Sequence, residues 1–179
     1  MNEHAKKKNI IDSRNISELI HFTPRRNIEL IKTHGLISAK QAHIKKLPIT
    51  RNDFKRLDNK KEGICLSITY ANEYVLGKFK KKYGGKWSII VVDPMVILTK
   101  KCFFYDCNAA SSKFRNCSDE YLSSSEAFEG MFARSIQTSN GPRARAWGSR
   151  KNLTTDVQAE IIVTESIATN YLEFINFGD

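Results

Sequence analysis

A glutamate at the start of an apolar run is the residue of this chain best placed for chemistry. Glu160 stands directly before Ile161, Ile162 and Val163, and Gln158 lies two positions earlier. Side chains alternate along a β-strand, so Gln158 and Glu160 are expected on one face. A carboxylate mounted on a strand and held over a sugar can stabilise an oxocarbenium-like centre. The alternative for Glu160 is an edge-strand charge that faces water.

Three further groups of polar residues are candidates to act with this glutamate. His21 and Thr23 end a predicted strand just before a helix, whose free N–H groups suit a phosphate or a ribose. Arg51 and Arg56 lie in a basic loop, where a guanidinium can grip a pyrophosphate. Asn108 follows an aromatic strand and either caps a turn or reads the edge of a base. Taken singly, each has an ordinary structural explanation: a hydrogen-bonded histidine, two solvated arginines and a turn.

A long polar loop over residues 138–155 combines cations with an aromatic side chain. It contains Arg143, Arg145, Trp147 and Arg150, just before the Glu160 strand. Cations beside an aromatic ring suit phosphate contact and base stacking on a single strand of nucleic acid. A solvated connecting loop is the alternative, and it carries nearly equal weight.

The net charge of +10 is spread unevenly along the chain. Residues 1–60 carry +8 and residues 61–117 carry +6, whereas residues 118–179 carry −4. A basic portion joined to an acidic one indicates a polyanionic partner such as nucleic acid. Ordinary surface charge is the alternative.

Composition favours one domain with its own core, and it excludes several classes of protein. The chain has 179 residues, 41% of them hydrophobic. No apolar run approaches the length of a membrane span, and the polar N-terminus lacks the apolar region of a secretory signal. The four cysteines form no CxxC pair and share no zinc spacing with the four histidines. We therefore expect a cytoplasmic protein with reduced cysteines, no metal and no membrane contact.

The pattern of elements predicts an α+β fold, because short strands and helices occur without regular βαβ alternation. Residues 1–13 are expected to form a basic, flexible arm, and residues 14–179 a single domain. Helices are expected from Thr23 as N-cap through Pro24 to His34, over residues 72–83, and after a capping box from Ser123 to Glu126 with Phe128, Met131, Phe132 and Ile136 on its inner face. Strands are expected over residues 16–22, 63–68, 87–92, 102–105, 160–163 and 171–177.

The order of these features resembles the DarT family, toxin enzymes that ADP-ribosylate bases in single-stranded DNA. The resemblance covers residues 14–175. It rests, in chain order, on a His-x-Thr strand with a helix and Gly35, the arginine loop, and the segments 66–70, 108–110 and 158–160.

The resemblance implies the ADP-ribosyltransferase fold, in which two small β-sheets with flanking helices split around a cleft for NAD⁺. NAD⁺ would be the co-substrate, no metal would be needed, and Glu160 would be the catalytic glutamate. The family's catalytic arginine falls in the loop after the first helix, where Arg56 is the first choice and Arg51 the second.

The same resemblance assigns the remaining candidates to the two substrates. His21, Thr23 and Asn27 would line the nicotinamide-ribose side. Gly35 and Ser67 belong to the same cofactor-binding set. Tyr70 and Tyr74 are candidates to stack on the nicotinamide. With single-stranded DNA as the acceptor, the nucleic-acid roles inferred above from residue types for Asn108 and for the cations of the 138–155 loop would be contacts with that DNA.

One position departs from the family pattern, and one segment distinguishes two branches of the family. Asp106-Cys107 precedes Asn108 where a glycine is expected. The lead into Gln158, Thr154-Thr155-Asp156, is closer to the guanine-modifying branch of the family than to the thymine-modifying one.

The family role also implies a partner, a cognate hydrolase antitoxin that strips ADP-ribose from DNA. A monomer is the simplest expectation for the oligomeric state. Two other hypotheses stay open. One keeps the fold but places the acceptor on RNA or protein, although Gln158 stands where arginine-directed relatives carry a second acid. The other is a non-catalytic basic domain that binds nucleic acid.

Overall fold

The computed structural model describes residues 1–49 and 63–175 of the chain. Its helices are α1 (Glu3–Arg14), α2 (Ile28–His34), α3 (Ala39–Ile44), α4 (Glu73–Tyr83), α5 (Val96–Thr99), α6 (Asp119–Leu122) and α7 (Ser125–Gly130), with short 3-10 turns η1 (Arg25–Asn27), η2 (Ser112–Phe114) and η3 (Thr169–Tyr171). Its strands are β1 (Leu19–Pro24), β2 (Ile64–Ile68), β3 (Trp87–Val92), β4 (Cys102–Tyr105), β5 (Ser135–Thr138), β6 (Gly141–Ala144), β7 (Glu160–Val163) and β8 (Leu172–Phe174).

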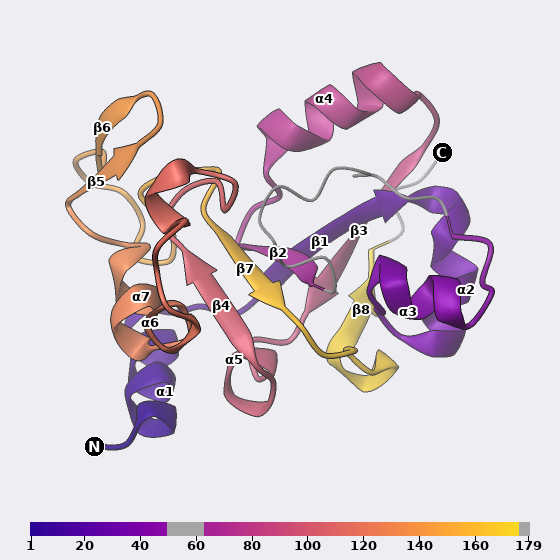
Figure 1. Ribbon diagram of the computed structural model, residues 1–179, viewed down its shortest axis with the longest axis horizontal. Helices are drawn as coiled ribbons and strands as arrows, with labels where there is room; N and C mark the ends of the chain where they lie inside the picture. Colours follow the sequence, from indigo (N-terminus) through magenta and orange to yellow (C-terminus); the bar gives the residue numbers. More distant parts are fainter. Residues whose placement is uncertain (50–62, 176–179) are drawn as a thin grey trace.

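The main sheet has six strands in the order β4-β7-β2-β1-β3-β8, and it consists of two halves (Figure 1). β1 pairs with β3 along its whole length, but with β2 only through Leu19 to Ile68 and Ile20 to Ser67. Past Ile20, β1 forms no further residue pair with β2. The mixture of helices and split sheets confirms the predicted α+β class.

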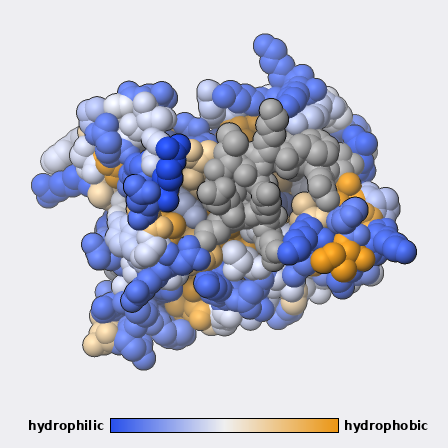
Figure 2. Space-filling view, viewed as in Figure 1, coloured by the Kyte–Doolittle hydropathy of each residue, from blue (hydrophilic) through white to orange (hydrophobic). Residues whose placement is uncertain are grey.

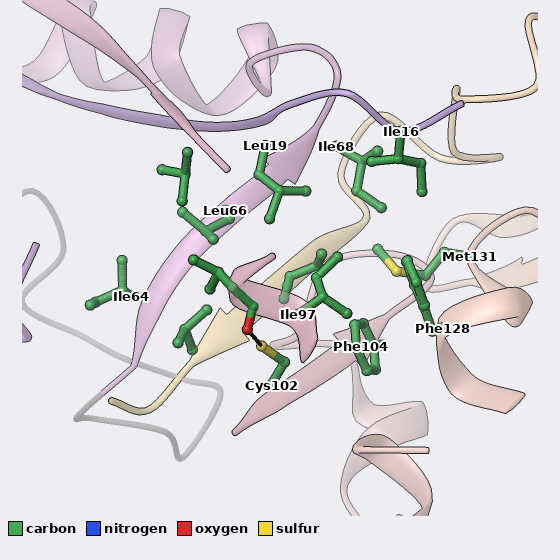
Figure 3. Packing of buried hydrophobic residues seen from close by; sticks show 14 of the residues in the cluster. Ile16, Leu19, Ile64, Leu66, Ile68, Ile97, Cys102, Phe104, Phe128 and Met131 are labelled. Carbon is green, nitrogen blue, oxygen red and sulfur yellow. Dashed lines mark hydrogen bonds between the residues drawn. The ribbon is translucent and has the colours of Figure 1, made fainter. Parts of the chain in front are cut away.

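One face of the sheet forms the larger core. Leu19, Leu66, Ile161 and Phe104 come from four neighbouring strands and lie on this face, as the strand registers require (Figure 3). Helices α1, α5 and α7 cover it, and the ring of Phe128 in α7 stacks on Phe104 with centroids 4.6 Å apart. The larger core therefore lies against the face of β7 opposite to the one on which Glu160 projects.

The opposite face of the β4-β7-β2 half carries a smaller core. Phe103 and Ile162 pack there against Ala109, which follows β4, and Leu122, the last residue of α6. Ala109 and Leu122 therefore lie over the face on which residue 160 projects, because Glu160 and Ile162 alternate with Ile161.

The predicted flexible arm over residues 1–13 is wrong in its local structure. These residues lie mostly in helix α1, which buries Ile10 and Ile11 against the core. The Glu3 carboxylate accepts hydrogen bonds from the backbone N–H of Ser125, at 2.7 Å, and from its hydroxyl, at 3.1 Å. Tertiary contact with α7 orders a segment whose composition alone is polar and basic.

The predicted helix start at Thr23 and Pro24 is also wrong. Both residues extend β1, opposite Ser88 and Trp87, and α2 begins only at Ile28 after the turn η1. β1 pairs with β3 as far as Pro24, and this pairing keeps Thr23 and Pro24 extended although the local sequence favours a helix there. Proline is tolerated there because β1 forms no residue pair with β2 past Ile20, so this side of the strand end is an unpaired edge.

The second predicted capping site is displaced by one residue. Ser124, not Ser123, caps α7 and accepts from the N–H of Ala127 at 3.1 Å. α7 ends at Gly130, so Ile136 is placed by β5 and not by the helix. Part of the predicted loop over residues 138–155 forms β6, which pairs with β5 as a hairpin.

The other predicted elements agree with the structure within a few residues. Strands β2, β3, β4 and β7 and helix α4, capped by Asn72, occupy the predicted places. Within the predicted closing strand over residues 171–177, β8 covers Leu172–Phe174, and residues 176 and 177 lie outside the described residues. No helix in the described residues has the length and apolar character that a membrane span requires.

Replacing Gly35 by alanine is expected to destabilise the fold by about 2 kcal/mol or more. Gly35 has φ 72° and ψ −175°, and an added Cβ would lie 2.2 Å from the carbonyl oxygen of Ile167. Leu36 and Ile167 exchange backbone hydrogen bonds of 2.9 Å, so the two segments cannot easily move apart. Denaturant unfolding measures the loss. Gly130→Ala, where a Cβ meets nothing within 4 Å, is the control and should not destabilise.

The link from α1 to α7 should be sensitive to acid. The backbone hydrogen bond from Ser125, with help from Lys6, lowers the pKa of Glu3 from 4.5 to about 2. A carboxylate with a lowered pKa stabilises the fold above its unfolded pKa, and this stabilisation is lost as the pH falls through the folded value. Between pH 4.5 and about pH 2, wild type should lose more unfolding free energy than Glu3→Gln. Equal losses in the two proteins would contradict this role; Glu29→Gln, at an exposed pair with Lys32, is the control.

Candidate active site

Glu160 is the first residue of β7, opposite Tyr105 of β4. Its side chain is half-buried, and its Oε1 accepts a hydrogen bond of 2.8 Å from the backbone N–H of Ala109. The paired strand fixes the backbone of Glu160, and the N–H of Ala109 fixes the direction of the carboxylate. An edge-strand charge that simply faces water would not be held in this way.

The Ala109 N–H is presented by a tight turn that Asn108 builds. Asn108 Oδ1 accepts from the N–H of Ala110 at 2.9 Å, and the Asn108 carbonyl accepts from the N–H of Ser111 at 2.9 Å. Of the two predicted roles for Asn108, turn capping describes these contacts, while contact with a base remains a prediction.

A lysine anchors the same segment to the β5-β6 hairpin. Lys113 Nζ lies 2.6 Å from Asp106 Oδ1 and 2.9 Å from the carbonyl of Gln137. Lys113 thus holds the start of the segment that contains the Asn108 turn and connects this segment to β5.

Ser67 is the cofactor-binding candidate that the sheet brings closest to the glutamate. The β2-β7 register pairs Leu66 with Ile161, and one further step places Ser67 beside Glu160. Ser67 is buried and also pairs with Ile20 of β1, at the last residue pair that joins the two halves of the sheet. Glu160 therefore lies at the point where the sheet splits.

His21 of β1 connects the two halves of the sheet through its side chain. Its Nδ1 lies 3.0 Å from the carbonyl oxygen of Cys65 in β2, so Nδ1 carries the proton of the neutral ring and Nε2 is the acceptor. Burial lowers the pKa of His21, and the hydrogen bond to Cys65 acts in the opposite direction. Strand alternation from Ile20 places His21 on the sheet face opposite Glu160, so the two approach the split from different sides.

Thr23 and Asn27 form a buried pair at the end of β1. Asn27 Nδ2 donates to Thr23 Oγ1 at 3.0 Å, and the two residues are 6% and 3% exposed. Gly35 lies beyond them, after α2, where its role is the close approach to Ile167. The contact of these three candidates with a nucleotide remains a prediction.

Gln158 does not share a strand with Glu160. It lies in a turn closed by the hydrogen bond from the Ala159 N–H to the Asp156 carbonyl, at 3.0 Å, so strand alternation does not apply to it. Asp156 is 1% exposed, and its Oδ1 accepts from the Gln158 N–H at 2.8 Å and from Arg143 at 3.3 Å. This buried carboxylate fixes the chain that enters β7.

The cations of the predicted DNA-binding loop have different roles. Arg145 donates to the carbonyls of Leu153 and Arg150, so its guanidinium holds the loop together. Arg150 donates to the hydroxyl of Tyr70 at 3.0 Å, and Trp147 is fully exposed. The loop is therefore folded on itself and docked beside the end of β2.

Tyr70 and Tyr74, the predicted stacking residues, are both about half exposed, at 52% and 54%. The Lys78 ammonium lies 4.1 Å from the centre of the Tyr74 ring. The predicted catalytic arginines, Arg56 and Arg51, lie outside the described residues. No group of three or more residues suited to hold a metal occurs in the part of the chain that the structure describes.

Sequence reasoning missed two groups at this site. The donor to Glu160 is a backbone N–H of Ala109, which leaves no mark in residue types, although Asn108 is a typical turn former. Asp156 is an isolated acid in a polar loop, and its burial depends on Arg143 and on the fold around it.

Comparison with known families gives one clear result. The model of the family described as "ssDNA thymidine ADP-ribosyltransferase, DarT" matches residues 20–178, which include Glu160 and His21. A search of curated proteins found no match. Because the matched segment spans nearly the whole chain, with a split sheet and a fixed glutamate at its joint, this protein belongs to the DarT family of NAD⁺-dependent single-stranded-DNA ADP-ribosyltransferases.

Proposed function

We propose that Glu160 is the catalytic glutamate of a toxin that transfers ADP-ribose from NAD⁺ to a base in single-stranded DNA. The observation that supports this role is the hydrogen bond from Ala109 to Glu160 at the joint of the split sheet. It holds the carboxylate in one direction before any substrate binds, and electrostatic stabilisation is strongest when the stabilising group is pre-oriented.

The chemistry needs a negative charge beside the ribose. Breaking the bond between ribose C1′ and nicotinamide releases nicotinamide with the bonding electrons and leaves positive charge on the ribose. The Glu160 carboxylate stabilises that charge. A nitrogen of the acceptor base forms the new bond to C1′ and loses its proton. The arginine assigned to the diphosphate is Arg56 or, as second choice, Arg51.

His21 suits the ribose side of this proposal. Its Nδ1 proton is held by Cys65, and burial favours the neutral ring, so Nε2 can accept a hydrogen bond from a ribose hydroxyl. Neutral acceptors and carboxylates are the groups that sugar hydroxyls require. The Glu160 carboxylate and His21 Nε2 are therefore acceptors suited to the hydroxyls of the NAD⁺ ribose, and we take Thr23, Asn27 and Ser67 as further cofactor-binding residues.

The DNA-binding part of the proposal rests on Trp147, Arg150, Arg143 and Asn108. The exposed Trp147 ring is available for stacking on a base, and Arg150 lies beside Tyr70 at the end of β2. Arg145 is reassigned: its donors bind carbonyls within the loop, so it supports the loop and does not bind phosphate.

For the acceptor base we place thymine before guanine. The family description names thymidine. The residues that favoured guanine have internal contacts: Thr154 Oγ1 donates to the Asp156 carbonyl at 2.8 Å and Thr155 Oγ1 to the Ala133 carbonyl at 2.5 Å. Guanine stays as the second candidate on the sequence resemblance in this segment.

The proposal includes the cellular role implied by the resemblance. A protein that modifies DNA bases in the cytoplasm of its own cell needs an antidote, and a hydrolase that removes ADP-ribose from DNA is the partner expected. A monomer is sufficient, because Glu160 and the residues that orient it come from one chain.

Labelled NAD⁺ offered with single-stranded DNA, duplex DNA and RNA tests the acceptor. We expect label on single-stranded DNA only, and mass spectrometry of the digested nucleosides should find ADP-ribosyl-thymidine. ADP-ribosyl-guanosine would instead support the second candidate. Label on RNA or on protein alone would contradict the DNA acceptor, and no transfer at all would favour a non-catalytic binding domain.

Removing the turn that orients Glu160 should slow the reaction. Asn108→Ala deletes the acceptor for the Ala110 N–H, so we expect kcat to fall roughly tenfold with a small change in KM for NAD⁺. Asn108→Asp keeps the acceptor and should restore most of kcat. Asn140→Ala, in the exposed β5-β6 turn, is the matched control. An unchanged kcat in Asn108→Ala would show that this turn does not position the glutamate.

A further inference from the structure

The outer face of α4 carries a stripe of exposed residues. The inner face contacts the sheet: Leu76 is buried, and the Phe79 ring stacks on Trp87 with centroids 5.9 Å apart. The opposite side carries Tyr74, Gly77, Lys78 and Lys81, whose spacing of three, four and seven residues places them in one row. We call these four residues the outer stripe.

The positive charge of α4 is not compensated. Lys78, Lys80, Lys81 and Lys82 are exposed, and within residues 1–49 and 63–175 none of them forms an ion pair. Favourable interaction with the helix dipole explains lysines in the last turn, but Lys78 lies before that turn. The helix has a single acid, Glu73, in its first turn.

Gly77 is the second unusual feature of the stripe. A glycine in a helix interior lowers helix stability relative to alanine. Packing does not require it here, because an added Cβ would meet nothing within 4 Å. Glycine without a packing reason is typical of a place where another molecule approaches the backbone closely.

The stripe continues from the candidate site. Tyr70, which accepts a hydrogen bond from Arg150 at 3.0 Å, lies four residues before Tyr74, so the loop with Trp147 and the start of α4 are neighbours. In Figure 1 α4 runs along the outer edge of the molecule away from this point, and Figure 2 shows hydrophilic residues over it. A strand of DNA with one base at Glu160 would pass along α4.

We propose that the outer stripe of α4 binds the sugar–phosphate backbone of single-stranded DNA that flanks the modified base. Lys78 and Lys81 contact phosphates, Gly77 leaves room for the strand, and the Tyr74 ring adds a surface where the stripe meets the site. Cations in line with an aromatic ring form the usual combination on single-stranded nucleic acid. This inference rests on the proposed DNA acceptor.

Fluorescence anisotropy without NAD⁺ tests the surface independently of catalysis. The double variant Lys78→Gln/Lys81→Gln should bind a labelled 20-nucleotide single strand roughly tenfold more weakly at low salt, and the slope of log affinity against log salt should fall by about 1.4, the value for two phosphates on a single strand. Lys100→Gln/Lys101→Gln removes the same charge near α5, on the other side of the sheet from α4 in Figure 1, and should leave both values near wild type.

Gly77 gives a test in which stability and binding change in opposite directions. Gly77→Ala and Gly77→Gln should both raise Tm, by roughly 2–4 °C for alanine. Gly77→Gln should nevertheless weaken binding of the 20-nucleotide strand, because its side chain fills the space above the backbone. Unchanged binding by Gly77→Gln would overturn the role of this glycine.

Oligonucleotide length separates failure of this inference from failure of the proposed function. If the stripe binds flanking DNA, Lys78→Gln/Lys81→Gln should slow modification of a 20-nucleotide strand and leave that of a 5-nucleotide strand unchanged. Equal binding and equal modification by wild type and variant would overturn the inference. If wild type binds but modifies neither strand while the lysine variant loses binding, the stripe stands and the DNA acceptor fails.

Discussion

Two residue pairs hold the halves of the main sheet together, and the placement of the candidate site depends on them. Leu19 with Ile68 and Ile20 with Ser67 join β1 to β2, and beyond them the strands separate. The same β2 residue, Ser67, stands next to Glu160 in the register. A short joint of this kind brings strands from the two halves to one point, while past Ile20 β1 forms no residue pair with β2.

Several polar side chains that the sequence suggested as substrate contacts form hydrogen bonds or ion pairs within the protein instead. Arg145 binds loop carbonyls, Asp156 is buried against Arg143, and Thr23 is paired with Asn27. Buried polar groups must be satisfied, so these contacts stabilise the loop and the turn that deliver Glu160. Among the described residues, the groups left for substrates include the oriented Glu160 carboxylate, the neutral His21, Arg150, the exposed Trp147 and the lysines of α4.

Local patterns predicted the elements that local forces determine. Alternating polarity predicted β2 and a continuous apolar run predicted β7, because both strands lie against the core. The start of α2 depends on the pairing of β1 with β3, and the helical structure of α1 depends on its contact with α7. Both partners are distant in sequence. Glu160 was found from its place before an apolar strand. The donor to its carboxylate, the backbone N–H of Ala109, was not predicted, because every residue except proline carries such a group and the sequence does not mark this one.

The central claim is that the Glu160 carboxylate, held by Ala109, carries the reaction. The most direct measurement is the single-turnover rate of nicotinamide release from NAD⁺, with saturating single-stranded DNA, for wild type and for Glu160→Gln. Glutamine keeps the size and the acceptor for the Ala109 N–H but removes the charge. The account predicts a fall of at least about a hundredfold with an unchanged Tm. A rate within a few-fold of wild type would contradict it.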